Sequence, residues 1–185
     1  ELEDFVLVLT DTKVKHTLAE TAYNLRRQEC EKGLKLIMSK YPEVKTFQDV
    51  ELFMLNSSEL PQEIRDRCTH VVEENQRVLR SGEALLSKDL NTIGKLLWAS
   101  HTGLSELYQV SCDELDLIVQ QSKKLDYVLG ARMMGGGFGG CCISLVKKEK
   151  VSNFEGSIKI AFQYAFGTTP EFYQFELVDG TSEVL

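Results

Sequence analysis

Apolar and polar positions follow one another along this chain in a way that predicts strands and helices in turn. Residues 5–10 are almost wholly apolar, as expected for a strand covered on both faces, and the polar residues 11–13 are expected to end it. A helical period then runs from residue 17 to about residue 41, with Leu25 on its apolar side and Arg26 on its polar side. The chain is therefore predicted to begin with a strand and a long amphipathic helix.

Three more helices are predicted in the middle of the chain. Pro61 suits the first position of a helix, and the apolar stripe along residues 64–86 continues that helix. A second helix covers about residues 90–108. Ser111 and Glu114 have the spacing of a capping box, which predicts the start of the third helix.

The last part of the chain predicts a hairpin, a helix and a final strand. A run of glycines at residues 135–140 leads into a short apolar strand at residues 141–146, and another strand is expected before the glycines. Ser152 and Glu155 have the spacing of a second capping box, so a helix is expected to begin there. Alternating side chains at residues 173–177 predict the final strand.

This order of elements favours an α+β fold. When the inserted helices are set aside, the order is that of the ferredoxin-like split βαβ arrangement, in which helices cover one face of an antiparallel sheet. Residues 1–185 are expected to form one domain, because no internal repeat or low-complexity linker divides them. Residues 43–60 have the weakest pattern of the chain and predict no clear element.

The composition is that of an ordinary globular protein, with 43% hydrophobic and 26% charged residues. A net charge of −7 and the lack of a basic stripe argue against binding to nucleic acid. No apolar stretch is long enough to span a membrane, and no signal-peptide pattern opens the sequence, so no membrane partner is expected. The five cysteines lack C-x-x-C spacing, which favours a reducing, cytoplasmic location over a disulfide framework or a zinc site.

The glycine run is the most unusual stretch of the sequence. It costs backbone entropy on folding, so it indicates positive φ angles or the close approach of another group. The run matches G-x-G-x-x-G, but a dinucleotide fold needs a helix after that motif, and here a strand follows. A backbone surface pressed against a ligand or a neighbouring domain is expected, and a bulged β-hairpin is the simpler alternative. The run consists of Gly135, Gly136, Gly137, Phe138, Gly139 and Gly140.

Residues 130–141, with the sequence GARMMGGGFGGC, resemble the third signature motif of galactokinases, which belong to the GHMP family of small-molecule kinases. Three further segments are similar to galactokinases in the same order: residues 14–30, 100–101 and 108–116. Together with the first strand, the similar segments extend over about residues 5–146. Separated matches in the order of the family are far more specific than the glycine motif alone.

The resemblance implies transfer of the γ-phosphoryl group of ATP to the 1-hydroxyl of galactose, the first step of galactose catabolism. In that family the N-terminal domain provides the sugar segment, the phosphate loop, the Mg²⁺ ligands and the catalytic aspartate. This sequence contains none of those motifs and starts with Glu1 rather than Met. It is therefore expected to be the C-terminal domain, with no catalytic residue of its own and inactive alone, while ATP and Mg²⁺ bind mainly to the missing N-terminal domain.

The resemblance also implies roles for individual positions. Tyr23 matches the tyrosine that contacts galactose, since a ring with a hydroxyl suits a sugar; a half-buried helix tyrosine is the simpler alternative. Lys15 matches a basic position near the transferring phosphate, and an ordinary solvated lysine is an equal alternative. The glycine run matches the loop that lines the cleft beside the sugar and the phosphates. An exposed apolar patch is expected around this loop and the first helix, where the absent domain would dock.

Two histidines are expected to lie outside the chemistry. His101 is expected to be a buried, hydrogen-bonded histidine, because no metal or nucleophile partner is in view, and His70 is expected to lie on the surface. Met134 stands where galactokinases often have threonine, and Ala22 where glutamate often precedes the tyrosine. These departures leave open a kinase for N-acetylgalactosamine, galacturonate or arabinose, and a non-catalytic sensor of sugar and ATP is a further alternative.

Overall fold

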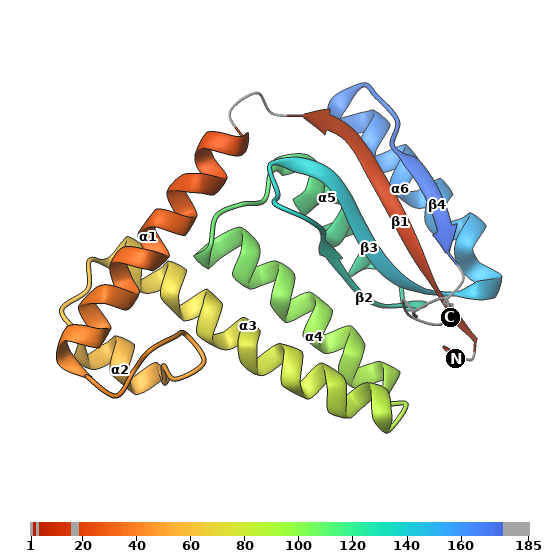
Figure 1. The fold of residues 1–185 in the computed structure, drawn as a ribbon. Coiled ribbons are helices and arrows are strands. Elements are labelled where there is room, and N and C mark those ends of the chain that lie inside the picture. The colour runs from red at the N-terminus through yellow and green to blue at the C-terminus, as the bar shows by residue number, and fades with distance from the viewer. Residues whose placement is uncertain (1, 3, 16–18, 176–185) are drawn as a thin grey trace, which may run out of the picture.

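The strands form one antiparallel sheet in the computed structural model, which describes residue 2 and residues 4–15 and 19–175 (Figure 1). The strand order is β2-β3-β1-β4, and each neighbouring pair is antiparallel. This is the order of the split βαβ arrangement, so the predicted α+β fold class is confirmed. The strands are β1 (Phe5–Lys15), β2 (Val128–Met133), β3 (Gly139–Lys147) and β4 (Glu171–Phe175).

Two helices cover one face of the sheet (Figure 1). They are α5 (Asp113–Ser122) and α6 (Val151–Phe166), which pack against each other and against β3, and a short turn, η2 (Lys148–Lys150), leads into α6. Side chains alternate along a strand, and the even-numbered residues of β1 and β3 point toward these helices. The sheet core between them includes Val8, Leu115, Ile118, Cys142, Val146, Phe154, Ile158 and Phe162.

The remaining helices form a layer beside β2 (Figure 1). Helix α4 (Leu90–Thr102) packs along β2, and the helix predicted at residues 90–108 ends in a π-helical turn, η1 (Gly103–Leu107). Helix α3 (Gln62–Leu86) packs on α4, while α1 (Ala19–Lys40) and α2 (Leu52–Ser57) pack on α3. The helical core between α1, α2 and α3 includes Ile37, Val44, Leu55, Ile64, Cys68 and Val72.

Strand β1 is longer than the apolar pattern predicts. Its polar residues do not end the strand but form a bulge, where the pairing with β3 shifts between Asp11 and Lys15 and Lys13 adopts a φ of 60°. The Asp11 carboxylate accepts a hydrogen bond from the Lys13 amide at 2.8 Å, which stabilises this conformation. The predicted final strand is present as β4 up to Phe175, and residues 176–177 lie outside the described part of the chain.

At both predicted capping boxes the helix begins at another position than the spacing indicates. Helix α5 begins at Asp113, and the Ser111 hydroxyl donates to the Asp116 carboxylate at 2.5 Å instead of capping the helix. Helix α6 begins at Val151, directly after the η2 turn, so Ser152 lies within its first turn rather than before it. In both places the spacing of Ser and Glu in the sequence does not give the exact first residue of the helix.

The buried faces of α1 and α3 also differ from those predicted. Leu25 is exposed and Arg26 is mostly buried, the reverse of the expected helix face. The first half of the predicted stripe of α3 is buried, but its second half extends past the helical core, and Leu86 is 89% exposed. His70 is buried rather than on the surface, because η1 packs over this part of α3, and Arg67 is buried beside it.

Candidate functional site

The glycine run forms the turn between β2 and β3, and we call residues 134–140 the glycine hairpin. The Met134 amide donates to the Cys141 carbonyl at 2.8 Å and closes the turn. L side chains rarely adopt positive φ angles, which explains why so many glycines are needed here. The hairpin residues with positive φ are Gly135, Gly137, Phe138, Gly139 and Gly140.

The glycine hairpin rests on the segment that follows η1. A Cβ atom at Gly137 would lie 2.0 Å from the Val110 carbonyl oxygen, so only glycine fits at this position. The Phe138 amide donates to the same carbonyl at 2.7 Å, and the buried Val110 donates in turn to the Leu104 carbonyl at 3.0 Å. At Gly137, the close approach expected from the sequence is therefore an approach to the backbone of the same chain.

Tyr23 lies against Gly136 of the glycine hairpin. Figure 1 shows the N-terminal end of α1 beside this turn. A Cβ atom at Gly136 would lie 3.4 Å from Cδ2 of the tyrosine ring. The Tyr23 side chain is 47% exposed. Within residues 4–15 and 19–175, neither its hydroxyl nor the amides of Gly135, Gly136 and Gly137 have a hydrogen-bond partner. The ring of Tyr23 thus lies against Gly136, in a stretch of the hairpin whose amides have no hydrogen-bond partner among the described residues.

Lys15 belongs to the same region through its backbone. It is the last residue of β1, and its Cα is paired with that of Gly139 at the base of the hairpin. The buried Thr12 fixes this end of β1, because its hydroxyl donates to the Gly140 carbonyl at 2.8 Å. The Lys15 side chain lies outside the described part of the structure, so its proximity to a phosphate stays a prediction.

His101 is buried and hydrogen-bonded at both ring nitrogens. The Met133 amide donates to His101 Nδ1 at 3.3 Å, so Nδ1 is an acceptor and the ring proton lies on Nε2, which donates to Asp116 at 3.0 Å. Burial raises the pKa of Asp116, but hydrogen bonds from His101, Ser111 and Ser105 outweigh it and lower the pKa. His101 thus ties α4 to the last residue of β2, immediately before the glycine hairpin.

Single exposed apolar side chains lie on the hairpin and on α1, and their grouping into the expected patch stays a prediction. Tyr23, Leu25 and Met134 all expose a large part of their side chains there. Exposed apolar side chains also lie at other places, such as Leu86 at the end of α3 and Tyr164 on α6. The exposed apolar side chains therefore do not distinguish this surface from the rest of the described chain.

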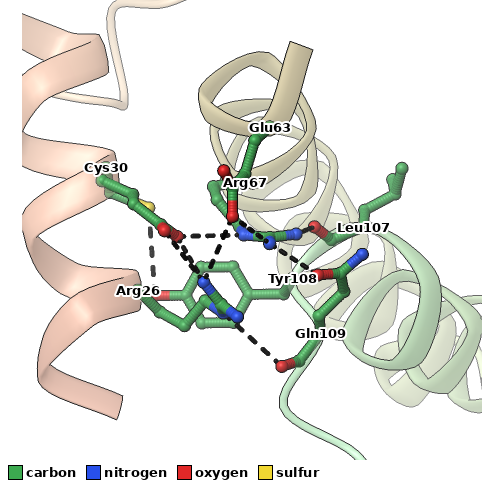
Figure 2. A network of polar contacts seen from close by, with 8 residues as sticks. Arg26, Cys30, Glu63, Arg67, Leu107, Tyr108 and Gln109 are labelled. Carbon is green, nitrogen blue, oxygen red and sulfur yellow. Dashed lines mark hydrogen bonds and ion pairs between the residues drawn. The ribbon is translucent and has the colours of Figure 1, made fainter. Parts of the chain in front are cut away.

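Two arginines close to this region were not recognised from the sequence. Figure 2 shows that Arg26 of α1 and Arg67 of α3 converge on the end of η1, where they meet Gln109. One signal was available for Arg26, since it lies three residues after Tyr23 and therefore on the same face of the helix. Arg67 lies between Ile64 and Cys68 of the apolar stripe of α3, where a charged residue is unexpected.

The described residues contain neither a cluster of metal ligands nor a helix suited to a membrane. Among residues 4–15 and 19–175, no three His, Cys, Asp or Glu side chains are placed together as metal ligands would be. None of the helices described in this range combines the length and the apolar character that crossing a membrane requires.

Comparison with known proteins defines the class of this domain. A family model described as "GHMP kinases C terminal" matches residues 83–163, from the end of α3 to α6. The crystal structure of Lactococcus lactis galactokinase complexed with galactose matches with a TM-score of 0.91 and 31% identity, and the match covers 100% of this chain and 48% of that chain. Mevalonate kinase of L. major, with a TM-score of 0.55 and 20% identity, shares the fold. Over the matched residues the chain is thus similar to the C-terminal domains of GHMP kinases.

Within that family, the chain is similar to galactokinases. Galactokinase of Thermotoga maritima is 41% identical over 184 residues, which are 100% of this chain and 51% of the relative. Galactokinase of Lactobacillus helveticus is 38% identical over 191 aligned residues, which cover 99% of this chain and 48% of the relative. The chain thus spans about half the length of the curated relatives that it matches.

Proposed function

We propose that residues 1–185 are the C-terminal domain of a galactokinase, which transfers the γ-phosphoryl group of ATP to the 1-hydroxyl of galactose. Sequence similarity over the whole chain and the close match to a galactokinase structure support this proposal. The observation that carries it is the position of the half-exposed Tyr23 ring against Gly136, in a hairpin whose amides at Gly135, Gly136 and Gly137 have no hydrogen-bond partner among the described residues. Such a surface suits a sugar, because the apolar face of the sugar ring can pack on the aromatic ring while its hydroxyls are hydrogen-bonded.

In this proposal the chain supplies one wall of a site between two domains. Tyr23 binds the sugar, and the glycine hairpin lets the substrate approach the backbone closely. Lys15, at the end of β1, would place a positive charge near the transferring phosphate. Phosphoryl transfer depends mainly on positioning and on stabilisation of developing charge, so one wall alone should have negligible activity.

ATP and Mg²⁺ enter the proposal through the similarity to galactokinases. The open amides of the glycine hairpin could donate to an anionic or hydroxyl oxygen, which fits a position near the substrate phosphate. The N-terminal domain is proposed to hold most of the ATP and the Mg²⁺, which neutralises the charge of the phosphates when it is bound. We place the intact protein in the cytoplasm, where cysteines such as the five free thiols of this chain stay reduced.

Specificity for a related sugar is a second candidate. Met134 begins the glycine hairpin and is 42% exposed, so it can contact a substrate at a position where galactokinases often have threonine. A larger apolar side chain there would change which substituent of the sugar is accepted. A non-catalytic sensor of sugar and ATP would use the same wall and would differ in the N-terminal domain.

The test is phosphorylation of sugars by the intact protein that carries this chain. With ATP and Mg²⁺ present, we expect turnover of galactose and weaker turnover of N-acetylgalactosamine, galacturonate and arabinose. The isolated 185-residue chain should have no measurable activity. Preference for another of these sugars would support the second candidate, and binding of galactose and ATP without turnover would support the sensor. Normal turnover by the isolated chain would contradict the proposed division into two domains.

A further inference from the structure

The network in Figure 2 connects α1, α3 and the end of η1. Arg67 of α3 is only 1% exposed. Its Nη1 donates to the Leu107 carbonyl, and its Nη2 donates to the Gln109 side chain at 2.7 Å. Arg26 of α1 donates from Nε to the Gln109 carbonyl at 3.5 Å. Guanidinium groups from two helices thus hold Gln109 by its side chain and by its backbone.

Glu29 links the two arginines. Its Oε2 accepts a hydrogen bond from Arg26 at 2.7 Å and another from Arg67 at 3.1 Å. Burial raises the pKa of Glu29, but the hydrogen bonds from the two arginines outweigh it and lower the pKa. Because Glu29 belongs to α1, its carboxylate attaches α1 to the buried arginine of α3. Removing one member of such a buried group leaves a charge without compensation, so the arrangement is rigid.

Gln109 is the point at which this network reaches the glycine hairpin. Its φ of 55° is unusual for a residue other than glycine, so its conformation depends on the contacts that hold it. The next residue is Val110, whose carbonyl accepts the Phe138 amide and touches Gly137. Fixing Gln109 therefore fixes the carbonyl on which the hairpin rests.

The same network also reaches Tyr23, which lies on α1. Tyr23 lies three residues before Arg26 and thus on the same face of α1. We infer that Arg67 is a positioning residue, which holds α1 and Gln109 together and so sets the distance between Tyr23 and the glycine hairpin. This inference rests on the proposed role of Tyr23 and the glycine hairpin in binding the sugar. The rate of phosphoryl transfer is sensitive to the distance between Tyr23 and the glycine hairpin, because a small misplacement of the bound substrate lowers the rate.

The decisive substitutions are at Gln109, because its side chain is at the surface and its replacement leaves the buried charges paired. Gln109→Asn tolerates a positive φ but is one methylene too short to reach Arg67 in the same way. Gln109→Glu keeps an acceptor oxygen at the original length and turns the hydrogen bond from Arg67 into an ion pair. Arg27→Met is the matched control, because Arg27 lies next to Arg26 but pairs with the exposed Glu31, away from the network.

The measurements are galactose kinetics of the intact protein and amide hydrogen exchange. We expect Gln109→Asn to raise the KM for galactose about tenfold with little change in kcat, as for loss of one hydrogen bond to a charged group. Gln109→Glu and Arg27→Met should keep the wild-type KM. Exchange of the Phe138 amide should become about tenfold faster in Gln109→Asn, while that of Ile118 in the sheet core stays the same. General loss of structure would accelerate both amides.

Two results would overturn the inference. One is a Gln109→Asn variant with wild-type galactose KM and wild-type exchange at Phe138. The other is a Gln109→Glu variant that behaves like Gln109→Asn, because the acceptor for Arg67 would then not be the cause. If the wild-type intact protein does not phosphorylate galactose, the proposed function fails, and the exchange of the Phe138 amide alone decides whether Gln109 holds the hairpin.

Discussion

The sheet core and the helical core hold their parts of the site by different means. On the sheet side, backbone touches backbone: a Cβ at Gly137 would meet the Val110 carbonyl oxygen at 2.0 Å, and a Cβ at Gly94 would meet that of Leu129 at 2.2 Å. On the helical side, apolar packing holds the rest of α1, but near the site α1 is held by long charged side chains such as Arg67. Contacts of the first kind tolerate no added atom, whereas contacts of the second kind depend on charge and on hydrogen-bond partners.

Gly137→Ala should have the largest effect, because the added methyl group meets a backbone carbonyl that cannot move away. Positive φ adds to this cost, so we expect the free energy of unfolding to fall by about 3–4 kcal/mol, or the hairpin to leave Val110. Urea denaturation measures the loss, and faster exchange of the Phe138 amide would locate it at the hairpin.

Gly135→Ala and Gly136→Ala are the matched controls for this prediction. Gly135 has positive φ but open space around it, so only backbone strain of about 1 kcal/mol is expected. Gly136 has no positive φ, and a Cβ there would lie 3.4 Å from Tyr23, close to ordinary van der Waals contact. Equal losses at Gly137 and Gly135 would show that contact with Val110 does not hold the hairpin.

Arg67→Met should have the next largest effect and tests the helical side. It removes a buried cation and leaves Glu29 and the Leu107 carbonyl without one of their donors. We expect a loss of about 3 kcal/mol in the free energy of unfolding, as is typical when one member of a buried charged group is deleted. Arg27→Met removes an exposed ion pair with Glu31 and should change stability by less than about 0.5 kcal/mol. Similar losses in both variants would argue that the Arg67 network is no stronger than a surface pair.

The difference between the two cores also explains what could be predicted from the sequence. The sheet and its helices follow from local periods of apolar residues, and the glycine run predicts its own turn. The predicted length of β1 was wrong, because a bulge at Lys13 carries the strand past the polar residues, and α5 begins at Asp113, one residue later than a cap at Ser111 predicts. These errors move the ends of elements and leave the fold unchanged.

The burial of polar residues could not be predicted in the same way. Arg67 meets the Leu107 carbonyl across 40 positions of the chain, and no local pattern encodes such a partner. The contact of Tyr23 with Gly136 has the same origin, and only the resemblance to galactokinases placed these residues in one site. A backbone approach such as that of Gly137 to Val110 has no signal in the sequence beyond the glycine itself.

His70 provides a pH-dependent test of the helical side. Burial lowers its pKa from 6.5 to about 4, with a smaller opposing effect of Glu74, while Arg77 and Arg132 lower it further. Between these two values only the unfolded chain binds the proton, so stability falls as the pH decreases. We expect a loss of about 2 kcal/mol between pH 7 and pH 4.5, measured by urea denaturation at each pH.

His70→Phe is the variant that isolates this effect. Phenylalanine keeps a ring against Tyr108, which lies 4.9 Å away between centroids, and it cannot be protonated. The loss of stability between pH 7 and pH 4.5 should become much smaller in this variant. The carboxylates with lowered pKa values, such as Glu29 and Asp116, lose their contribution mainly below their ordinary values of 4.5 and 3.8, at or below the lower edge of this window. An unchanged pH dependence would assign the loss to other groups.

Tyr23→Phe should have the smallest effect on stability, and it acts where the two regions meet. The ring keeps its contact with Gly136, and the lost hydroxyl has no partner in the described part of the chain, so the free energy of unfolding should change by less than about 0.5 kcal/mol. In the intact protein the KM for galactose should rise about fivefold with little change in kcat, as for one lost hydrogen bond to a neutral sugar. An unchanged KM together with unchanged stability would mean that the hydroxyl does not touch the sugar, and the Tyr23 ring would then serve only to pack α1 against the glycine hairpin.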